Sequence, residues 1–363
     1  MVNGRLTVIA KPDCGDYQQH RKPQQTPAVY QPVVLHAKIG NFSDRADGSN
    51  PIPGHHDHKN DHQENGSQNA CFYVHSRDYS ISRRPGIYGT NDCMDGELVL
   101  LKLGGSLITD KTVAYTPRLD VLAQLAVDLA EARRANPALR LVLGHGSGSF
   151  GHTAAKQHGT RGGLQPGTNT NHYWNGFAEV WYQARQLNRF VIDALHKQGV
   201  PSLTIDPVSA VTASDGKLSR WDLAPLKAAL AAGLVPVVHG DVIFDTLRGG
   251  TIFSTEDLFE HIARELHPGR ILLAGLEGAV WADYPVSKQR VETISPATFD
   301  EIKRSIGASH GADVTGGMES KVRQMLDLAQ EIPGLTAQIF SGEQPGNLQK
   351  TLAGENLGTL ITG

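Results

Sequence analysis

From residue 97 onward, short apolar runs alternate along the chain with longer segments of helical periodicity. The run LVLLKL at 98–103 predicts a buried strand. Later apolar runs predict strands at 141–143, 202–205, 234–238, 271–274, 337–340 and 358–361. Apolar residues three or four positions apart predict helices over 117–129, 172–195, 223–232, 256–266 and 298–306, and a further helix ending at 330. Residues 242–254 predict a β-hairpin. Strands separated by helices of this length are typical of a mostly parallel sheet covered on both faces.

Residues 1–95 differ in composition from the rest of the chain, because they are rich in Pro, Gly, Asn, Asp, Gln and His. No helical or strand period persists there. We therefore expect a poorly structured, non-catalytic extension over 1–95 and a folded domain over 96–363. The extension is either a leader or upstream sequence joined by a start assigned too early, since Met94 lies four residues before the first strand. Its histidine-rich tract at 55–62 is expected to bind transition metals only adventitiously.

The charge and the cysteine content exclude several classes of protein. A formal net charge of −3 gives no reason to expect a nucleic-acid or membrane partner. No apolar run approaches the roughly 18 residues of a membrane span, and residues 1–21 lack the apolar centre of a secretory signal. All three cysteines precede the domain, which argues against a disulfide framework or a cysteine-based zinc site in it. We expect a cytoplasmic protein whose side chains form no metal site.

Two glycine-rich loops follow predicted strands. Gly104 to Ser106 come directly after the strand that carries Lys102, with Lys111 close behind, and residues 144–151 form the second loop. Glycines allow backbone N–H groups to surround an anion, and lysines supply positive charge. Because the carboxyl ends of parallel strands share one edge, both loops should face one crevice. Either loop alone is more often a tight strand-to-helix turn, but the pair favours a site for two phosphorylated molecules.

His152 closes the second loop at the expected start of a helix. A histidine there can donate to a phosphate, and a dianionic ligand favours its protonated form. A lone histidine is more often a structural hydrogen-bonding residue, and His145, deeper in the turn, ranks below His152. A third glycine pair at 316–317 precedes Lys321, and taken alone it is typical of an ordinary loop before a solvated lysine.

Four motifs together resemble those of a known family: K-L-G-G-S-x-x-T-x-K at 102–111, G-S-G-S-F-G-H at 146–152, H-G-D-V at 239–242 and D-V-T-G-G-M-x-x-K at 313–321. This order resembles the amino acid kinase superfamily, and within it the isopentenyl phosphate kinase subfamily, over essentially all of 97–363. The resemblance implies an open αβα sandwich with a mostly parallel central sheet, usually a homodimer, that uses ATP with Mg²⁺. It also implies ATP-dependent phosphorylation of isopentenyl phosphate to isopentenyl diphosphate, a step of isoprenoid biosynthesis.

The resemblance also assigns roles to individual residues. The residues implied to bind ATP are Lys102, Gly104, Gly105, Ser106, Gly275, Thr315, Gly317 and Lys321. The residues implied to bind the acceptor are Ser147, Gly148, His152 and Thr255. The implied catalytic residues are Lys102, Lys111, His152 and Lys321. Their positive charges would offset the repulsion between two polyanions.

Some positions depart from the family pattern and leave the contacts to the nucleotide base and the fine specificity for the acceptor open. Ser147 stands where glycine is usual, S-T-E-D at 254–257 replaces S-G-D-D, and G-L-E-G at 275–278 replaces T-D-V-D-G. One apolar helix side is a candidate wall for an isoprenoid tail, although most of it is expected to be core. That side carries Phe177, Val180, Trp181 and Ala184. The alternatives are a fosfomycin-type phosphonate kinase and a non-catalytic ATP or phosphate sensor.

Overall fold

A computed structural model describes residues 96–283, 286–306 and 317–363 of the chain. The prediction of a poorly structured extension over 1–95, with its histidine-rich tract, lies outside these residues, and so does Thr315. No helix of the described part is both long enough and apolar enough to cross a bilayer.

The core of the domain is an eight-stranded sheet with the order β10-β12-β11-β9-β1-β2-β6-β3. Its strands are β1 (Leu98–Leu103), β2 (Arg140–His145), β3 (Ser202–Thr204), β6 (Val235–His239), β9 (Arg270–Gly275), β10 (Thr293–Ile294), β11 (Thr336–Ser341) and β12 (Thr359–Thr362). Every neighbouring pair is parallel except β11 and β12, which run antiparallel. The predicted mostly parallel sheet is confirmed, and β1 lies near its middle.

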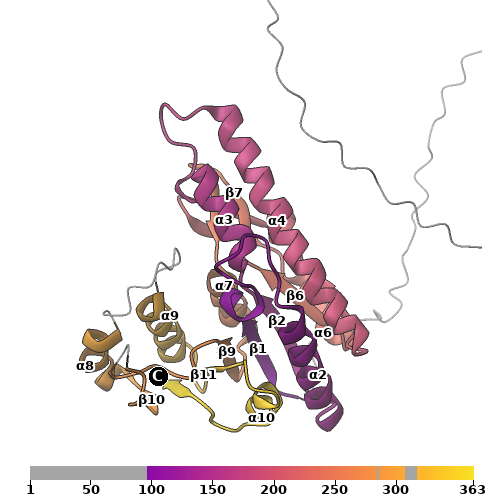
Figure 1. Cartoon of the computed structure of the whole chain (residues 1–363), viewed down its shortest axis with the longest axis vertical. Coiled ribbons are helices and arrows are strands. Elements are labelled where there is room, and N and C mark those ends of the chain that lie inside the picture. Colours follow the sequence, from indigo (N-terminus) through magenta and orange to yellow (C-terminus); the bar gives the residue numbers. More distant parts are fainter. Residues whose placement is uncertain (1–95, 284–285, 307–316) are drawn as a thin grey trace, which may run out of the picture. The chain divides into compact units, whose positions relative to one another are not determined.

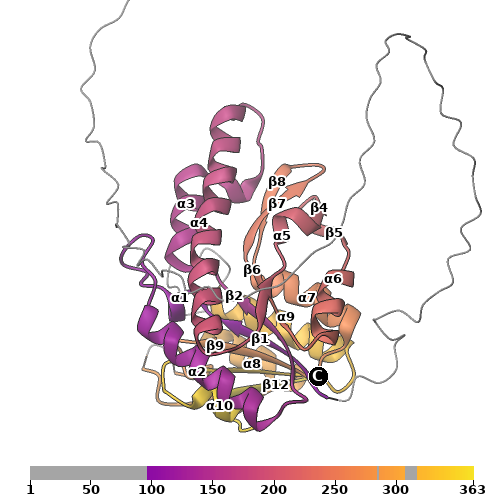
Figure 2. The same cartoon turned by 90° about the vertical axis from the view of Figure 1, so that its right-hand side faces the viewer.

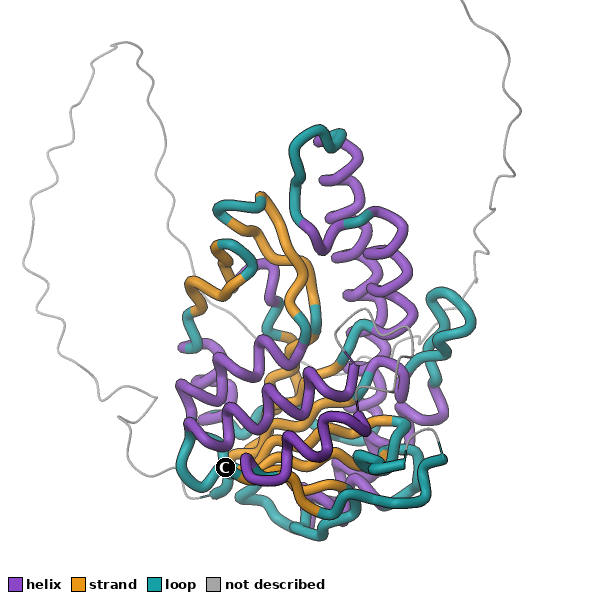
Figure 3. Tube along the Cα trace, turned by 90° about the vertical axis from the view of Figure 1, so that its left-hand side faces the viewer, coloured by secondary structure: helices purple, strands orange, loops and turns teal. Residues whose placement is uncertain are grey.

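Helices cover both faces of this sheet, as Figures 1 and 3 show, so the predicted αβα sandwich is confirmed. One face packs against α1 (Gly105–Ile108), α2 (Leu119–Ala135), α10 (Asn347–Leu352) and the C-terminal half of α4 (Thr170–Lys197). The other face packs against α6 (Ala224–Ala231), α7 (Thr255–Leu266), α8 (Pro296–Ile306) and α9 (Gly317–Glu331).

The pleat of β1 decides which way its lysine points. Leu98 and Leu100 belong to the core under α7 and α9, whereas Val99 and Leu101 belong to the opposite core. Because side chains alternate between the two faces of a strand, Lys102 shares the face of Leu98 and Leu100. The strand therefore directs Lys102 towards α7 and α9.

A second sheet of four strands, order β5-β4-β7-β8, stands beyond the large sheet. Its strands are β4 (Val211–Ser214), β5 (Lys217–Trp221), β7 (Asp241–Asp245) and β8 (Gly249–Phe253), and the short helix α5 (Pro207–Ala210) precedes them. The predicted hairpin over 242–254 is confirmed as β7 and β8, but β4 and β5 were not predicted. Figure 2 shows this sheet opposite α3 (Gly148–His158) and the N-terminal half of α4. A small apolar core joins them through Tyr173, Phe177 and Val242.

Two local predictions need correction. The glycine-rich stretch 144–151 is not an extended loop, because β2 runs to His145 and α3 begins at Gly148. His152 is accordingly the fifth residue of α3 rather than its first. The predicted helix beginning near Pro117 begins at Leu119, whose side chain is exposed instead of facing the core.

Candidate active site

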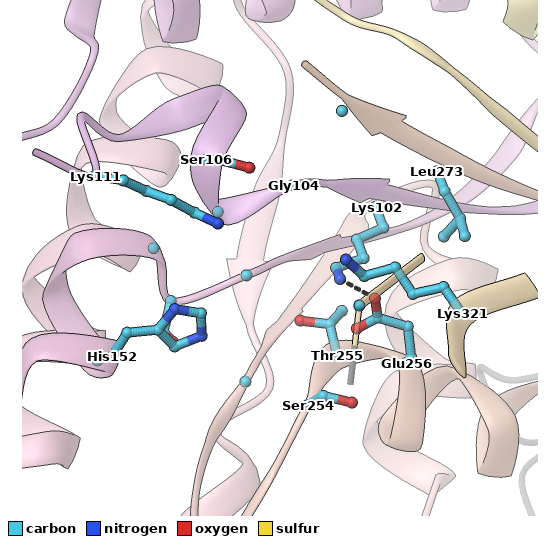
Figure 4. Close-up of a pocket in the computed structure, with 18 of the residues that line it drawn as sticks. Lys102, Gly104, Ser106, Lys111, His152, Ser254, Thr255, Glu256, Leu273 and Lys321 are labelled. Carbon is cyan, nitrogen blue, oxygen red and sulfur yellow. Dashed lines mark hydrogen bonds and ion pairs between the residues drawn. The ribbon is translucent and has the colours of Figure 1, made fainter. Parts of the chain in front are cut away.

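A cavity of about 910 Å³ opens at the carboxyl ends of β1, β2 and β9. It brings together every site residue named from the sequence except Thr315: Lys102, Gly104, Gly105, Ser106, Lys111, Ser147, Gly148, His152, Thr255, Gly275, Gly317 and Lys321. Figure 4 shows that these side chains come from both glycine turns, from α7 and from α9. The shared crevice expected from parallel strand ends is therefore present.

The two glycine turns touch each other through backbone atoms. A Cβ added to Gly105 would lie 2.5 Å from the amide nitrogen of Gly148, and one added to Gly146 would lie 2.8 Å from that of Gly105. Gly148 has φ +50°, a conformation that favours glycine. The Ser149 N–H donates to Thr109 Oγ1 at 2.9 Å and ties the turns together. Any side chain here would push the turns apart.

Helix α7 presents a carboxylate to the two lysines on this face of the sheet. Ser254 and Asp257 form a capping box, in which the Ser254 side chain accepts from the Asp257 N–H and the Asp257 carboxylate accepts from the Ser254 N–H. The cap occupies Asp257, so the neighbouring Glu256 turns into the cavity and pairs with Lys102 Nζ. Figure 4 shows Lys321 of α9 reaching towards the same carboxylate.

The charges around Glu256 are buried together. Glu256 is 5% exposed and Lys102 is 8% exposed. Burial alone would raise the pKa of the Glu256 carboxyl, but the charges of Lys102 and Lys321 outweigh burial and hold that pKa below its ordinary value. Glu256 therefore remains ionised and fixes the position of the Lys102 ammonium group.

Glu256→Gln is expected to lower the free energy of unfolding at neutral pH by about 3 kcal/mol, because the buried Lys102 ammonium group loses the carboxylate with which it pairs. The folded-state pKa of Glu256 is lowered, so the carboxylate stabilises the fold above the ordinary carboxyl pKa of about 4. That stabilisation is lost as the pH falls through the folded-state pKa. The gap between wild type and variant should therefore narrow in acid, as measured by urea unfolding across a pH series.

Glu292 is the matched control, because its side chain is 64% exposed and pairs with Arg290 at the surface. Glu292→Gln should cost less than about 1 kcal/mol at any pH. A gap for Glu256→Gln that stays constant from neutral pH into acid would contradict the buried ion pair.

The opposite end of the cavity is bounded by α3, α4 and the small sheet. His152 lines this end from α3. The apolar side chains Ala155, Val180 and Ile252 also line it, and we call the space between them the apolar chamber. Of the four wall residues expected on α4, only Val180 reaches the cavity. The others are Phe177 and Ala184, which are buried in the core, and Trp181, which is 36% exposed.

Two residues considered from the sequence have structural partners. His145 does not line the cavity, because it is fully buried beneath the turn, where its Nδ1–H donates to the Gly146 carbonyl. Burial and the neighbouring His239 lower the pKa of His145 to about 3, so its ring is uncharged. Thr255 lines the cavity, but its hydroxyl donates to the His145 carbonyl at 2.6 Å.

Several cavity residues were not identified from the sequence as site residues. They are Glu256, Asp241, Lys156, Arg161 and Trp281. The sequence did carry a signal for Glu256. The S-x-x-D spacing at 254–257 is typical of a capping box, which uses Ser254 and Asp257 and leaves Glu256 available for the site. The others belong to segments whose approach to the cavity depends on long-range packing.

Comparisons with known proteins agree with this site. The family model described as the amino acid kinase family matches residues 97–341. The isopentenyl phosphate kinase of Methanothermobacter thermautotrophicus is 31% identical over 272 residues, covering 73% of this chain and 99% of that protein. The isopentenyl phosphate kinase of Haloferax volcanii is 37% identical over 271 residues, covering 73% and 99%. A solved structure described as "X-ray structures of isopentenyl phosphate kinase" superposes with a TM-score of 0.62 at 28% identity, covering 73% of this chain and all of that one. The chain therefore belongs to the amino acid kinase family.

Proposed function

We propose that this protein transfers the γ-phosphoryl group of ATP to isopentenyl phosphate and releases isopentenyl diphosphate and ADP. The observation that carries the proposal is the pair of interlocked glycine turns at one cavity, with Lys102 and Lys321 at one end and His152 at the other (Figure 4). The apolar side chains Ala155, Val180 and Ile252 also line the cavity. Relatives at 31% and 37% identity carry the name isopentenyl phosphate kinase. Neither comparison favours a phosphonate kinase or a sensor.

In the proposed reaction an oxygen of the acceptor phosphate attacks the γ-phosphorus, and the bond from that phosphorus to the β,γ-bridging oxygen breaks. ADP leaves with the bonding electron pair. The attacking oxygen is already ionised, so no general base is needed. The chain's task is to hold two polyanions in line and to spread the charge of the transferring group. Lys102, Lys111 and Lys321 would do this on the donor side, and His152 on the acceptor phosphate.

Magnesium would enter this site with ATP. Among the described residues that line the cavity, the carboxylates are Asp241, Glu256 and Glu277. Glu256 is paired with Lys102, and Glu277 accepts from the Trp281 indole N–H. The ATP phosphates would therefore supply most of the ligands of Mg²⁺, whose bound form neutralises developing charge on the phosphates.

The proposed activity is tested directly with the purified full chain, ATP and Mg²⁺. Addition of isopentenyl phosphate should produce a diphosphate visible by ³¹P NMR and should release ADP in equal amount. Fosfomycin should be turned over far more slowly. Equal ADP release with and without isopentenyl phosphate, or faster turnover of fosfomycin, would overturn the proposal.

Val180→Trp is expected to raise the KM for isopentenyl phosphate by at least ~10-fold and to leave the KM for ATP unchanged, because the larger side chain would fill the apolar chamber. Steady-state kinetics with each substrate varied in turn measures the effect. The control is Trp181→Ala, one residue further along α4, because Trp181 does not line the cavity. A similar rise in the KM for isopentenyl phosphate in both variants would mean that the isopentenyl tail binds elsewhere.

The homodimer implied by the family resemblance and the cytoplasmic location expected from the composition stay predictions. Size-exclusion chromatography with light scattering measures the first, and fractionation of native cells measures the second.

A further inference from the structure

Two carboxylates and one imidazole, outside the lysine cluster, converge on one buried point. Asp206 precedes α5, His239 ends β6 and Asp241 begins β7. One ligand atom from each lies within 4.8 Å of the other two, and His239 Nε2 lies 3.6 Å from Asp206 Oδ1. This point lies where the chain passes from the large sheet to the small one.

The converging atoms are acceptors without hydrogen-bond partners among the described residues. They are Asp206 Oδ1, His239 Nε2 and Asp241 Oδ2. His239 is fully buried and Asp241 is 1% exposed. A buried acceptor without a donor loses its hydration and gains nothing in return. Three of them facing one another call for a proton, a water or a cation between them.

The remaining atoms of these side chains have partners that fix their orientation. The His239 Nδ1–H faces the Gly240 carbonyl at 3.3 Å, so the lone pair of the neutral ring is on Nε2. Asp241 Oδ1 accepts from the Val242 N–H at 2.8 Å, which leaves Oδ2 for the shared point. A backbone partner of this kind on the other ring nitrogen is typical of histidines that bind metals.

The Asp206 side chain does not cap the helix that it precedes. It occupies the N-cap position of α5, where an aspartate normally accepts from a backbone N–H, yet its side chain makes no capping bond. One carboxylate oxygen pairs with Arg185 of α4 and the other faces His239. Arg185 thus orients the carboxylate from outside the cluster, as hydrogen-bonding groups around metal ligands do.

A further ring packs against this cluster. The imidazole of His145 stacks on that of His239, with 5.2 Å between the ring centroids.

We propose that Asp206, His239 and Asp241 form a binding site for one divalent transition-metal ion. One imidazole nitrogen and two carboxylate oxygens suit Zn²⁺, Mn²⁺ or a similar ion better than Mg²⁺ or Ca²⁺, which prefer oxygen ligands alone. Asp241 also lines the large cavity. The ion would join β6, β7 and the start of α5 at the junction of the two sheets. This proposal does not depend on the identity of the acceptor.

The test uses the full chain with the histidines of 55–62 changed to serine, so that the tract contributes no metal binding. After chelation, exposure to Zn²⁺ and gel filtration, metal analysis should find a single ion per chain. Asp241→Asn should lose that ion, and so should His239→Gln. Asp128→Asn is the matched control, because Asp128 is equally buried but accepts from Gln124 and from the Gly346 N–H. It should keep the ion.

A second measurement covers the case in which both site variants fail to fold. X-ray absorption of the Zn²⁺-loaded parent chain should show a first shell of nitrogen and oxygen with one imidazole. Zn²⁺ should also raise the Tm of the parent chain and of the control variant, because it binds the folded state. Absence of bound Zn²⁺ in the parent, retention of it in a folded site variant, or a shell of several imidazoles would each overturn the proposal and leave a proton or a water to bridge the three acceptors.

Discussion

His152→Ala is expected to lower kcat with isopentenyl phosphate by ~10²–10³-fold, the range found when a single donor to a transition-state anion is removed. The Kd for ATP should change by less than about twofold, because His152 lies across the cavity from the cluster of Lys102, Glu256 and Lys321 (Figure 4). Steady-state kinetics gives the first quantity and calorimetric titration with ATP gives the second.

His152→Gln keeps a donor at this position and should recover part of the rate. His172→Ala is the control for loss of a histidine, since His172 is exposed on α4 and does not line the cavity. Wild-type turnover in His152→Ala would rule out the assigned contact with the acceptor phosphate. An equal loss of ATP binding would assign His152 to the donor side instead.

Lys102→Met is expected to lower kcat by ~10³-fold, because the ammonium group is held by Glu256 beside the phosphate turns where transferring charge develops. The same change removes the ion pair of the buried Glu256 carboxylate with Lys102 and leaves that carboxylate the charge of Lys321. The free energy of unfolding should therefore also fall by about 3–5 kcal/mol. Urea unfolding and steady-state kinetics on the same preparation separate the two effects.

The double variant Lys102→Met, Glu256→Leu separates the loss of stability from the loss of activity. Replacing a buried ion pair with apolar residues of similar size is often neutral, so the free energy of unfolding should return to within about 1–2 kcal/mol of wild type. Activity should stay as low as in Lys102→Met. Recovery of activity together with stability would mean that Lys102 serves the fold alone.

The elements that carry a strong period could be predicted from the sequence. Helix α4 shows its apolar side at helical spacing over many turns, and β1 is an unbroken apolar run except for Lys102. A buried lysine in such a run has few roles other than pairing with an anion. The candidate site could therefore be predicted from short motifs, because each motif joins a strand end to a turn whose backbone geometry is local.

What depends on long-range packing could not be predicted in this way. Strands β4 and β5 are short and partly exposed, and their register shifts between Thr212 and Ala213, so they carry little apolar alternation. The turn between them did carry a sequence signal, because an Asp-Gly pair is typical of a tight hairpin turn. Asp215 and Gly216 both have the positive φ that such a turn requires. His239 and Asp241 belong to the H-G-D-V motif at 239–242, but nothing in the sequence indicated that Asp206 would meet them. Their convergence arises because a loop after β3 meets the end of β6.

The backbone contact between the two glycine turns has a consequence for redesign of the protein. Because Gly105 meets Gly148 without intervening side chains, the main chain sets the spacing between the proposed donor and acceptor sites. Substitutions in either glycine turn are therefore expected to disrupt both proposed sites at once. Variation aimed at new acceptors should instead sample the chamber walls at Ala155, Val180 and Ile252, where a change in volume leaves that spacing intact.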